Sequence, residues 1–454
     1  MIAGLEPYAA YANTGQDWLG PVPAHWSALR AKRLFREVDE RSKTGKEELL
    51  SVSHLTGITP RRLKTVTMFL AESNVGHKVC QPGDLVINTL WAWMAALGVT
   101  RHTGIVSPAY GVYRPVTGSG ILPAYANHLL RTPLYAAEYL RRSTGVNSSR
   151  LRLYPEQFLR IPVLAPPLAE QLAIIRFLDW SNARLEQAIR AKRKVIALLN
   201  EQKQVIIHRA VTCGLAPSVP LKPSGIPWLG DIPKLWEVSR VKNEFRCLNK
   251  WRMPLNSVER GTMTSRKYDY YGASGVIDKV DDFLFDDELL LIAEDGANLV
   301  LRNLPLAIIA RGKFWVNNHA HILKPKRGSI VYLAHLLETL NYTPWISGAA
   351  QPKLTQDRLL SISIAIAPPE EQEVIVLQTS EKTRPLVTAI SRLEREIELL
   401  REYRTRLVAD LVTGKLDVRD TAAQLPDDTA FSMPDMAPAA DAGDEEAEVE
   451  ATTE

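Results

Sequence analysis

Two long segments of the chain carry apolar residues at a helical spacing. Between residues 386 and 411 these positions alternate in steps of four and three, with one arginine among them. This is the spacing of a heptad repeat, so it predicts a long helix with one stripe that packs against another helix. The stripe consists of Leu386, Ile390, Leu393, Ile397, Leu400, Arg404, Leu407 and Leu411.

An equivalent stripe with two lysines occurs earlier, at Leu185, Ile189, Lys192, Ile196, Leu199, Lys203 and Ile206. Long lysine stems can cover apolar surface while the ammonium group stays in water. Pro167 and Pro369 precede the two stripes, and Gly214 and Gly414 follow them, as is typical of helix starts and ends. Each helix should span about 43 residues, or about 65 Å.

Three blocks of sequence outside the helices occur twice. "DWLGPVPAHW" from Asp17 is similar to "PWLGDIPKLW", whose Trp228, Gly230, Pro233 and Trp236 lie 210 residues after their counterparts. Tryptophan is rare here, 10 in 454 residues, so two aligned tryptophans indicate duplication rather than chance. We expect both tryptophans of the second phrase to pack as apolar anchors.

The other two blocks complete the repeat. "GIVSPAYGVYRP", residues 104–115, is similar to "FWVNNHAHILKP", residues 314–325, and the alternation in each predicts a strand with one buried face. "LAPPLAEQ" and "IAPPEEQ" match directly before the long helices. The chain is therefore an internal tandem repeat.

The repeat predicts an α/β fold with two α/β bodies, 1–165 and 216–367, and two long helical segments, 166–215 and 368–416. Neither helix can bury its stripe alone in water, so we expect the two to pair as an antiparallel coiled coil. Equivalent helices paired in this way give pseudo-twofold symmetry, with one body at each end of a rod. Residues 417–454 are predicted to be a disordered acidic tail.

Charge divides the chain in the same place. Residues 417–454 hold twelve Asp or Glu and one Arg, whereas the preceding 416 residues hold 54 basic and 39 acidic residues, a net charge of +15. A basic body indicates a partner that is a polyanion. A purely solubilising tail without further function is an equally good interpretation of the last segment.

Several classes of protein are disfavoured. No apolar run approaches the roughly 18 residues of a membrane span, and no secretory signal is evident. Three scattered cysteines without metal spacing fit a reducing cytoplasm. The chain lacks a phosphate-binding G-x-x-x-x-G-K-[ST] loop and the Asp/Asn-Pro-Pro-aromatic turn of adenine methyltransferases, so we expect no catalytic residues and no enzyme activity.

The duplicated unit, with "SGIPWLGDIPKLW" at its entry and "PPLAEQ" before its helix, resembles the specificity subunits (HsdS) of type I restriction–modification systems. "YYGASGVIDKVDDFLFDD", "LLLIAEDGAN" and "FWVNNHAHIL" resemble one target-recognition domain of that family, and "GDLVIN" with "SPAY" resembles another. The resemblance covers residues 1 to about 416. The first hinge departs from it by an extra Leu168, and the lysines on the first stripe are less usual.

The resemblance implies that each body recognises one half of a bipartite site on double-stranded DNA. The helix pair would set the spacer between the half-sites and dock two modification methyltransferase subunits (HsdM). Restriction and translocase subunits (HsdR) would complete the complex. S-adenosylmethionine, ATP and Mg would then be bound by those partners and not by this chain.

Candidate DNA-binding residues lie in the divergent bodies. Arg61, Arg62 and Lys64 form one basic cluster, and Arg101 with His102 precedes the loop at Gly104. Basic groups neutralise phosphates, but which of these contact bases is open. A basic run, residues 190–194, marks the first long helix.

The second body adds Arg266, Lys267 and Tyr268, for which a solvated loop edge is the alternative. Asn317 and Asn318 could pair with the N6/N7 edge of adenine, or could cap their own turn. His319 joins them as a candidate. With His321 it forms an H-x-H pair that should face the same way on a strand, but we expect hydrogen bonding or packing there and no metal site.

The alternative function is a coiled-coil adaptor that binds only proteins. The basic body argues against it, and a salt-dependent shift of random DNA would separate the two hypotheses.

Overall fold

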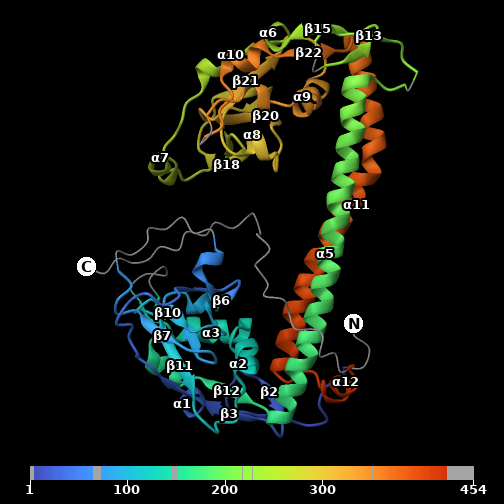
Figure 1. Ribbon diagram of the computed structural model, residues 1–454. Coiled ribbons are helices and arrows are strands. Elements are labelled where there is room, and N and C mark those ends of the chain that lie inside the picture. Colours follow the sequence, from blue (N-terminus) through green and yellow to red (C-terminus); the bar gives the residue numbers. More distant parts are fainter. Residues whose placement is uncertain are drawn as a thin grey trace. The chain divides into compact units, whose positions relative to one another are not determined.

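The computed structural model of the protein describes residues 5–64, 73–145, 151–216, 218–226, 229–348 and 351–426. The chain divides into two compact units (Figure 1). Unit 1 comprises residues 1–191 and 395–454, and unit 2 comprises residues 192–394. Each unit therefore contains one α/β body together with part of each long helix, instead of a body separated from a helical spacer.

The body of unit 1 is built on short strands. Its strands are β1 (Tyr11–Asn13), β2 (Pro21–Pro23), β3 (Ser27–Arg30), β4 (Phe35–Glu37), β5 (Leu50–Ser53), β6 (Gly57–Pro60), β7 (Lys78–Cys80), β8 (Leu85–Ile87), β9 (Leu97–Val99), β10 (Gly104–Val106), β11 (Gly111–Pro115) and β12 (Pro162–Ala165). The central sheet has the order β4-β11-β8-β9, and β3 pairs separately with β12. The helices are α1 (Ala31–Leu34), α2 (Pro123–Leu130), α3 (Pro133–Arg142) and α4 (Pro155–Leu159).

The body of unit 2 has a larger sheet, in the order β16-β21-β19-β20-β17-β18. Its strands are β13 (Leu221–Pro223), β14 (Asp231–Pro233), β15 (Glu237–Arg240), β16 (Phe245–Cys247), β17 (Tyr268–Gly272), β18 (Gly275–Val280), β19 (Phe285–Ala293), β20 (Ala307–Val316), β21 (Ala320–Pro325) and β22 (Ser363–Ile366). Its helices are α6 (Val241–Glu244), α7 (Ser257–Gly261), α8 (Asn298–Leu301), α9 (Ile330–Thr339) and α10 (Gln356–Ser361). In β21 the first four residues are all buried, so both faces of this strand are covered, unlike the prediction of one buried face.

A common frame recurs in the two units and confirms the duplication. The pairs β1–β2, β3–β12 and β4–β11 of unit 1 correspond to β13–β14, β15–β22 and β16–β21 of unit 2. The basic residue aligned by the repeat also pairs with an aspartate in both units. Arg114 pairs with Asp84, which directly precedes β8, and Lys324 pairs with Asp287 of β19. The sheets inserted into this frame differ, as the divergence of residues 41–100 and 251–310 indicates.

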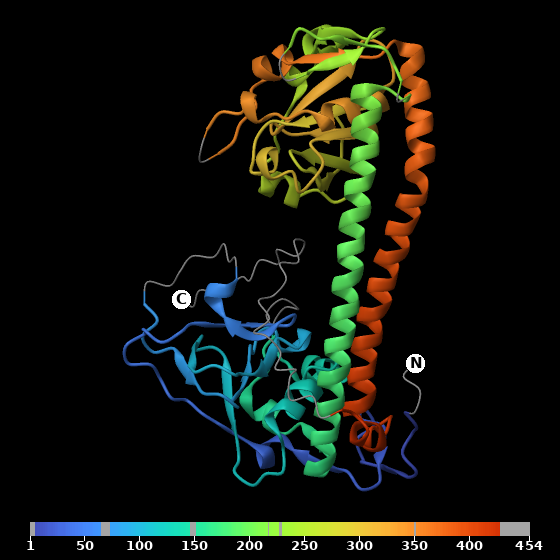
Figure 2. The same cartoon turned by 45° about the vertical axis from the view of Figure 1, so that its right-hand side comes forward.

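The two long helices are α5 (Leu168–Cys213) and α11 (Pro369–Val412), of 46 and 44 residues. Every position of both predicted stripes is buried or half-buried, which confirms the heptad assignment. In unit 1 the start of α5 shares a core with Leu407 and Leu411 of α11, and in unit 2 Val211 shares a core with Ile375. The two helices therefore pair antiparallel within each unit (Figures 1 and 2). None of the helices in the described ranges is long and apolar enough to cross a membrane.

A helix joint, defined by Trp26, Glu170 and Gly414 in unit 1, ties both long helices to the body. The Trp26 indole nitrogen donates to the Glu170 carboxylate in the first turn of α5 at 2.9 Å, and Tyr8 donates to the same carboxylate. Gly414 ends α11 with a positive φ of 76°, and a Cβ on it would lie 2.4 Å from Pro23 and 3.2 Å from Trp26. Only glycine therefore fits there.

Unit 2 repeats this arrangement with Trp236, Glu371 and Gly214. The Trp236 indole donates to Glu371 at 3.0 Å, and Gly214 has a φ of 79° beside the same indole. The following residue of each "EQ" pair, Gln171 or Gln372, is buried and donates to the carbonyl of Pro166 or Ala367. The repeated Trp is thus an anchor, as predicted for Trp236, while Trp228 lies outside the described residues.

The segment 417–426 is folded, so the prediction that the disordered tail begins at residue 417 was wrong. Val418 and Ala422, on either side of the start of helix α12 (Arg419–Ala423), are almost fully buried in the core of unit 1. The Asp417 amide donates to the carbonyl oxygen of Glu6 at 2.7 Å, and Arg176 donates to the carbonyl oxygen of Leu425 at 2.8 Å. Composition concealed this element because two small apolar residues sit among many polar ones.

We therefore predict different effects for two truncations. A chain ending at Leu416 loses the buried Val418 and Ala422 and should lose roughly 3 kcal/mol of stability in unit 1. A chain ending at Pro426 keeps both residues and should therefore be more stable than the chain ending at Leu416 by about that amount. Urea unfolding measures the difference in stability, and hydrogen exchange of the unit 1 amides shows whether the loss lies in unit 1. Equal protection in the two truncated chains would contradict the burial argument.

Candidate nucleic-acid interface

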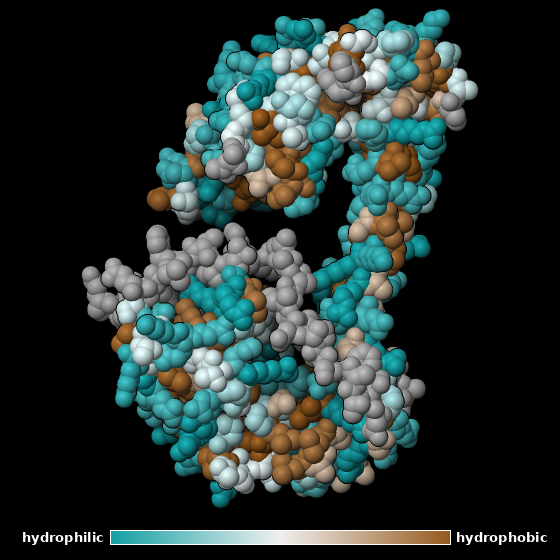
Figure 3. Space-filling view, viewed as in Figure 1, coloured by the Kyte–Doolittle hydropathy of each residue, from teal (hydrophilic) through white to brown (hydrophobic). Residues whose placement is uncertain are grey.

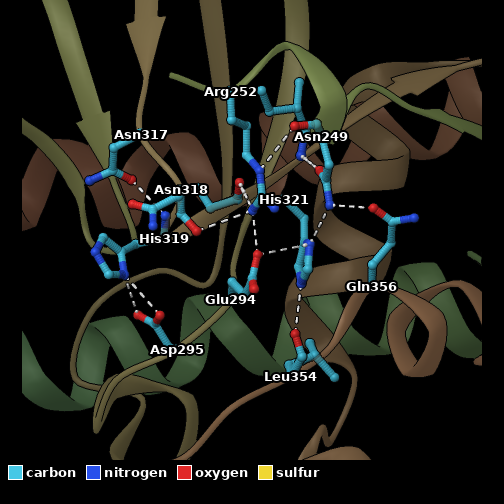
Figure 4. Close-up of polar contacts among 12 residues, drawn as sticks. Asn249, Arg252, Glu294, Asp295, Asn317, Asn318, His319, His321, Leu354 and Gln356 are labelled. Carbon is cyan, nitrogen blue, oxygen red and sulfur yellow. Dashed lines mark hydrogen bonds and ion pairs between the residues drawn. The ribbon is translucent and has the colours of Figure 1, made fainter. Parts of the chain in front are cut away.

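The turn between β20 and β21 presents three predicted candidates in different ways (Figure 4). Asn317 is only 6% exposed, and its side-chain oxygen accepts the His319 amide at 2.8 Å. This geometry fits the alternative in which Asn317 caps the turn. Asn318 and His319 are exposed, so they are the residues of this turn that a ligand could contact.

Beneath the turn lies a buried polar network centred on His321 of β21. Its Nε2 lies 2.7 Å from the carbonyl oxygen of Leu354, and its Nδ1 lies 2.9 Å from the side-chain nitrogen of Asn249. The carbonyl requires a proton on Nε2, so Nδ1 accepts from Asn249 and the ring is neutral. Burial lowers the pKa of His321, which favours the same state.

Glu294, at the end of β19, completes this network. It accepts from Arg252 and lies 3.3 Å from the Lys353 ammonium group. Burial alone would raise the pKa of Glu294, but the hydrogen bond from Arg252 and the nearby charges outweigh it and the pKa is lowered. Arg252 also donates to the carbonyl of Asn318 at 3.2 Å, so the network fixes the backbone of the turn.

The two histidines of the H-x-H pair do not face the same way. His319 lies in the turn before β21, and its ring binds Asp295 at 2.8 Å with 47% of the side chain exposed. His321 is on the strand and fully buried. The alternation argument failed because His319 precedes the regular strand. Among the described residues, no group of three or more His, Cys, Asp or Glu side chains could hold a metal ion.

The segment before β17 places Arg266 and Lys267 on the surface. Arg266 has a left-handed φ of 41°, and its amide donates to Asp281 at 2.6 Å. That hydrogen bond is the largest cause of the lowered pKa of Asp281. Tyr268 is half-buried, and its ring packs edge-on against Phe283 with centroids 5.1 Å apart. Its ring is therefore partly committed to packing.

In unit 1 the candidates occupy two separate places. Arg61 and Arg62 form a 3-10 turn (Arg61–Leu63) that ends at Lys64, and Arg62 pairs with Glu48 at 2.6 Å. Arg101 is exposed and His102 is half-buried in the loop between β9 and β10, where Thr100 bonds the His102 backbone. Of these five residues, only Arg101 lines a large cleft in unit 1 that lies between the β9–β10 loop, α2 and the two long helices.

Sequence reasoning missed two features of these surfaces. The Glu294 network draws on residues 249, 252, 321 and 353, whose spacing gives no signal. An apolar patch on unit 2 was missed as well, because α8 and the loop after it expose Val300, Leu301 and Leu304 (Figure 3). Exposed apolar residues that gather on one face are typical of contact surfaces.

Known proteins resemble parts of this chain. Residues 233–398, which include all the candidate residues of unit 2, match the family model described as the type I restriction modification DNA specificity domain. Residues 233–398 therefore resemble a DNA specificity domain of type I restriction–modification systems, which confirms, for this part of the chain, the resemblance inferred from the sequence.

Two further proteins are similar to this chain. A type I restriction enzyme specificity subunit of Haemophilus influenzae, S.HindORF215P, is 37% identical over 131 residues, which are 28% of this chain and 32% of that protein. The matching part thus spans about a third of the curated relative. A solved chain from a study of complex assembly and conformational transition of the type I R-M system has a TM-score of 0.53 at 14% identity, covering 86% of this chain and 98% of that one. At this identity the likeness shows the fold alone, an α/β chain with two long helices.

The β20–β21 turn offers a matched pair of substitutions. Asn317→Ala removes the cap of the His319 amide and should cost about 1 kcal/mol of stability. Asn318→Ala removes an exposed side chain and should change stability by less than about 0.5 kcal/mol. Urea unfolding and hydrogen exchange of the His319 amide test both variants. If Asn318→Ala were the more destabilising of the two, the assignment of the cap would be wrong.

Proposed function

We propose that this chain is the non-catalytic specificity subunit of a type I restriction–modification complex, and that each body recognises one half of a bipartite site on double-stranded DNA. One observation carries the proposal: a single frame occurs twice, and a different sheet is inserted in each copy. Recognition of two unrelated half-sites needs two different surfaces on equivalent supports. The specificity-domain match in unit 2 and the net charge of +15 on residues 1–416 support it.

In this proposal the partners carry the chemistry. Two modification methyltransferase subunits would bind S-adenosylmethionine, and restriction and translocase subunits would bind ATP and Mg. The chain itself would bind no cofactor and would act in the cytoplasm. The paired helices would hold the two half-sites at a fixed separation and dock the modification subunits.

Specific contacts would come from the exposed candidates and not from the buried ones. In unit 2 these are Asn318 and His319 on the β20–β21 turn, with Arg266 and Lys267 before β17. The network of Glu294, Arg252 and His321 would act indirectly by holding the turn in one conformation. Preorganised side chains lose less entropy on binding, so a rigid support favours discrimination between bases.

A body exchange tests the recognition of half-sites. Replacing residues 216–367 by the corresponding body of another type I specificity subunit should change one half of the methylated site and leave the other half unchanged. Methylome sequencing of cells that also express the modification subunit gives the answer. The chain without that subunit is the control and should transfer no methyl group. Changes in both half-sites would contradict independent recognition.

A paired insertion tests the helices as a spacer. Seven residues added after Ala191 and seven after Glu394 preserve the heptad stripe and lengthen the pair by about 10 Å. At roughly 3.4 Å per base pair, the methylated site should gain about three base pairs of spacer and keep its bases.

Two residues added at the same two points are the matched control. At 3.6 residues per turn they rotate the rest of each stripe by about 200°, away from the partner helix, so the helices should no longer pair and methylation should be lost. A functional seven-residue variant with an unchanged spacer would show that the helices do not set the distance.

A further inference from the structure

Unit 1 contains a cleft of about 1760 Å³ between its α/β body and its two long helices. The walls are the β9–β10 loop, α2, the first part of α5 and the last part of α11, which lie together in unit 1 (Figure 1). Six arginines line it: Arg101, Arg131, Arg176, Arg184, Arg190 and Arg404. Asp179 and Glu186 are the acidic residues of the lining, so arginines exceed carboxylates by four.

Contacts with described residues hold several arginines of the cleft in place. Arg184 lies over the Trp180 ring at 4.5 Å, and Arg404 pairs with Glu186 at 3.4 Å. The Arg131 Nε is buried without a hydrogen-bond partner in the described part of the chain. A guanidinium has five N–H donors, so these contacts leave capacity for a carboxylate or phosphate ligand.

His128 also lies in the positive potential of the cleft arginines. Burial lowers its pKa to about 4, and the charges of Arg131 and Arg101 act in the same direction. The histidine is therefore neutral at physiological pH and does not add to the positive charge. A ligand of this cleft should be anionic and should meet the arginines directly.

The described chain ends in this cleft. Leu425 and Pro426 belong to its lining, and Arg176 donates to both of their carbonyl oxygens, at 2.8 and 3.3 Å. The residues that follow, 427–454, contain ten Asp or Glu and no Lys or Arg. A covalently attached segment of this length has an effective concentration of about millimolar at a nearby site.

We propose that the cleft of unit 1 is a binding site for an acidic peptide, and that residues 427–454 of the same chain occupy it. Charge complementarity and the position of Pro426 select this occupant. Carboxylates and phosphates compete for the same guanidinium groups, so the bound tail would also weaken DNA binding at low salt. Only this last consequence rests on the proposed function.

The test uses a labelled synthetic peptide of residues 427–454 and fluorescence anisotropy at low ionic strength. A chain ending at Pro426 should bind the peptide, and the full chain should bind it at least about tenfold more weakly because its own tail competes. In the chain ending at Pro426, the double variant R101E/R190E should lower peptide affinity by about tenfold. Both arginines are exposed, so folding should be unaffected, and thermal unfolding checks this.

The matched control is R33E/R36E, which makes the same change of charge at exposed positions of unit 1 outside the cleft. It should leave peptide affinity within about twofold of the unmodified chain. Equal losses in the two double variants, or equal peptide binding by the full and shortened chains, would overturn the proposal. Peptide binding as expected in a chain that binds no DNA would support the cleft while refuting the proposed function.

Discussion

The hydrogen bond from an entry tryptophan to a glutamate in the first turn of a long helix is the contact on which both units depend. It occurs twice, from Trp26 to Glu170 and from Trp236 to Glu371. The same indole lies against the glycine that ends the other long helix. One side chain thus fixes the start of one helix and the end of the other against the body. A buried indole N–H needs a partner, and a carboxylate at a helix N-terminus also interacts favourably with the helix dipole.

Because of this helix joint, the frame residues and the inserted sheets are under different constraints. Both units have a tryptophan, a glutamate, a glutamine and a glycine at equivalent positions, and these residues make the contacts that join the long helices to the body. The sheets between the frame strands need only connect β4 to β11, or β16 to β21, and fill their own cores. Unit 1 does so with a four-stranded sheet and unit 2 with a six-stranded one. A recognition surface can therefore change while its support stays constant.

Periodicity and local chemistry predicted the long helices, their stripes, their terminal glycines and the duplication, because these depend on neighbours in the sequence. The orientation of Asn317 depends on whether the turn is buried by residues remote in the chain, so the sequence left it open. The network that joins Asn249, Arg252, Glu294 and His321 was invisible for the same reason. Residues 417–426 were misassigned because their two buried side chains are small and their composition is that of the tail.

The way in which chain segments are divided between the two units affects folding during synthesis. Unit 2 is one continuous stretch, residues 192–394, whereas unit 1 needs residues 395–426 to fill its core with Leu407, Leu411, Val412 and Val418. During translation, unit 1 cannot complete its core until residues 395–426 have been synthesised, whereas unit 2 can fold earlier. Domains generally fold in the order of their synthesis, so this chain reverses the usual order of completion. A chain released at residue 394 would present a finished second unit attached to an open first one.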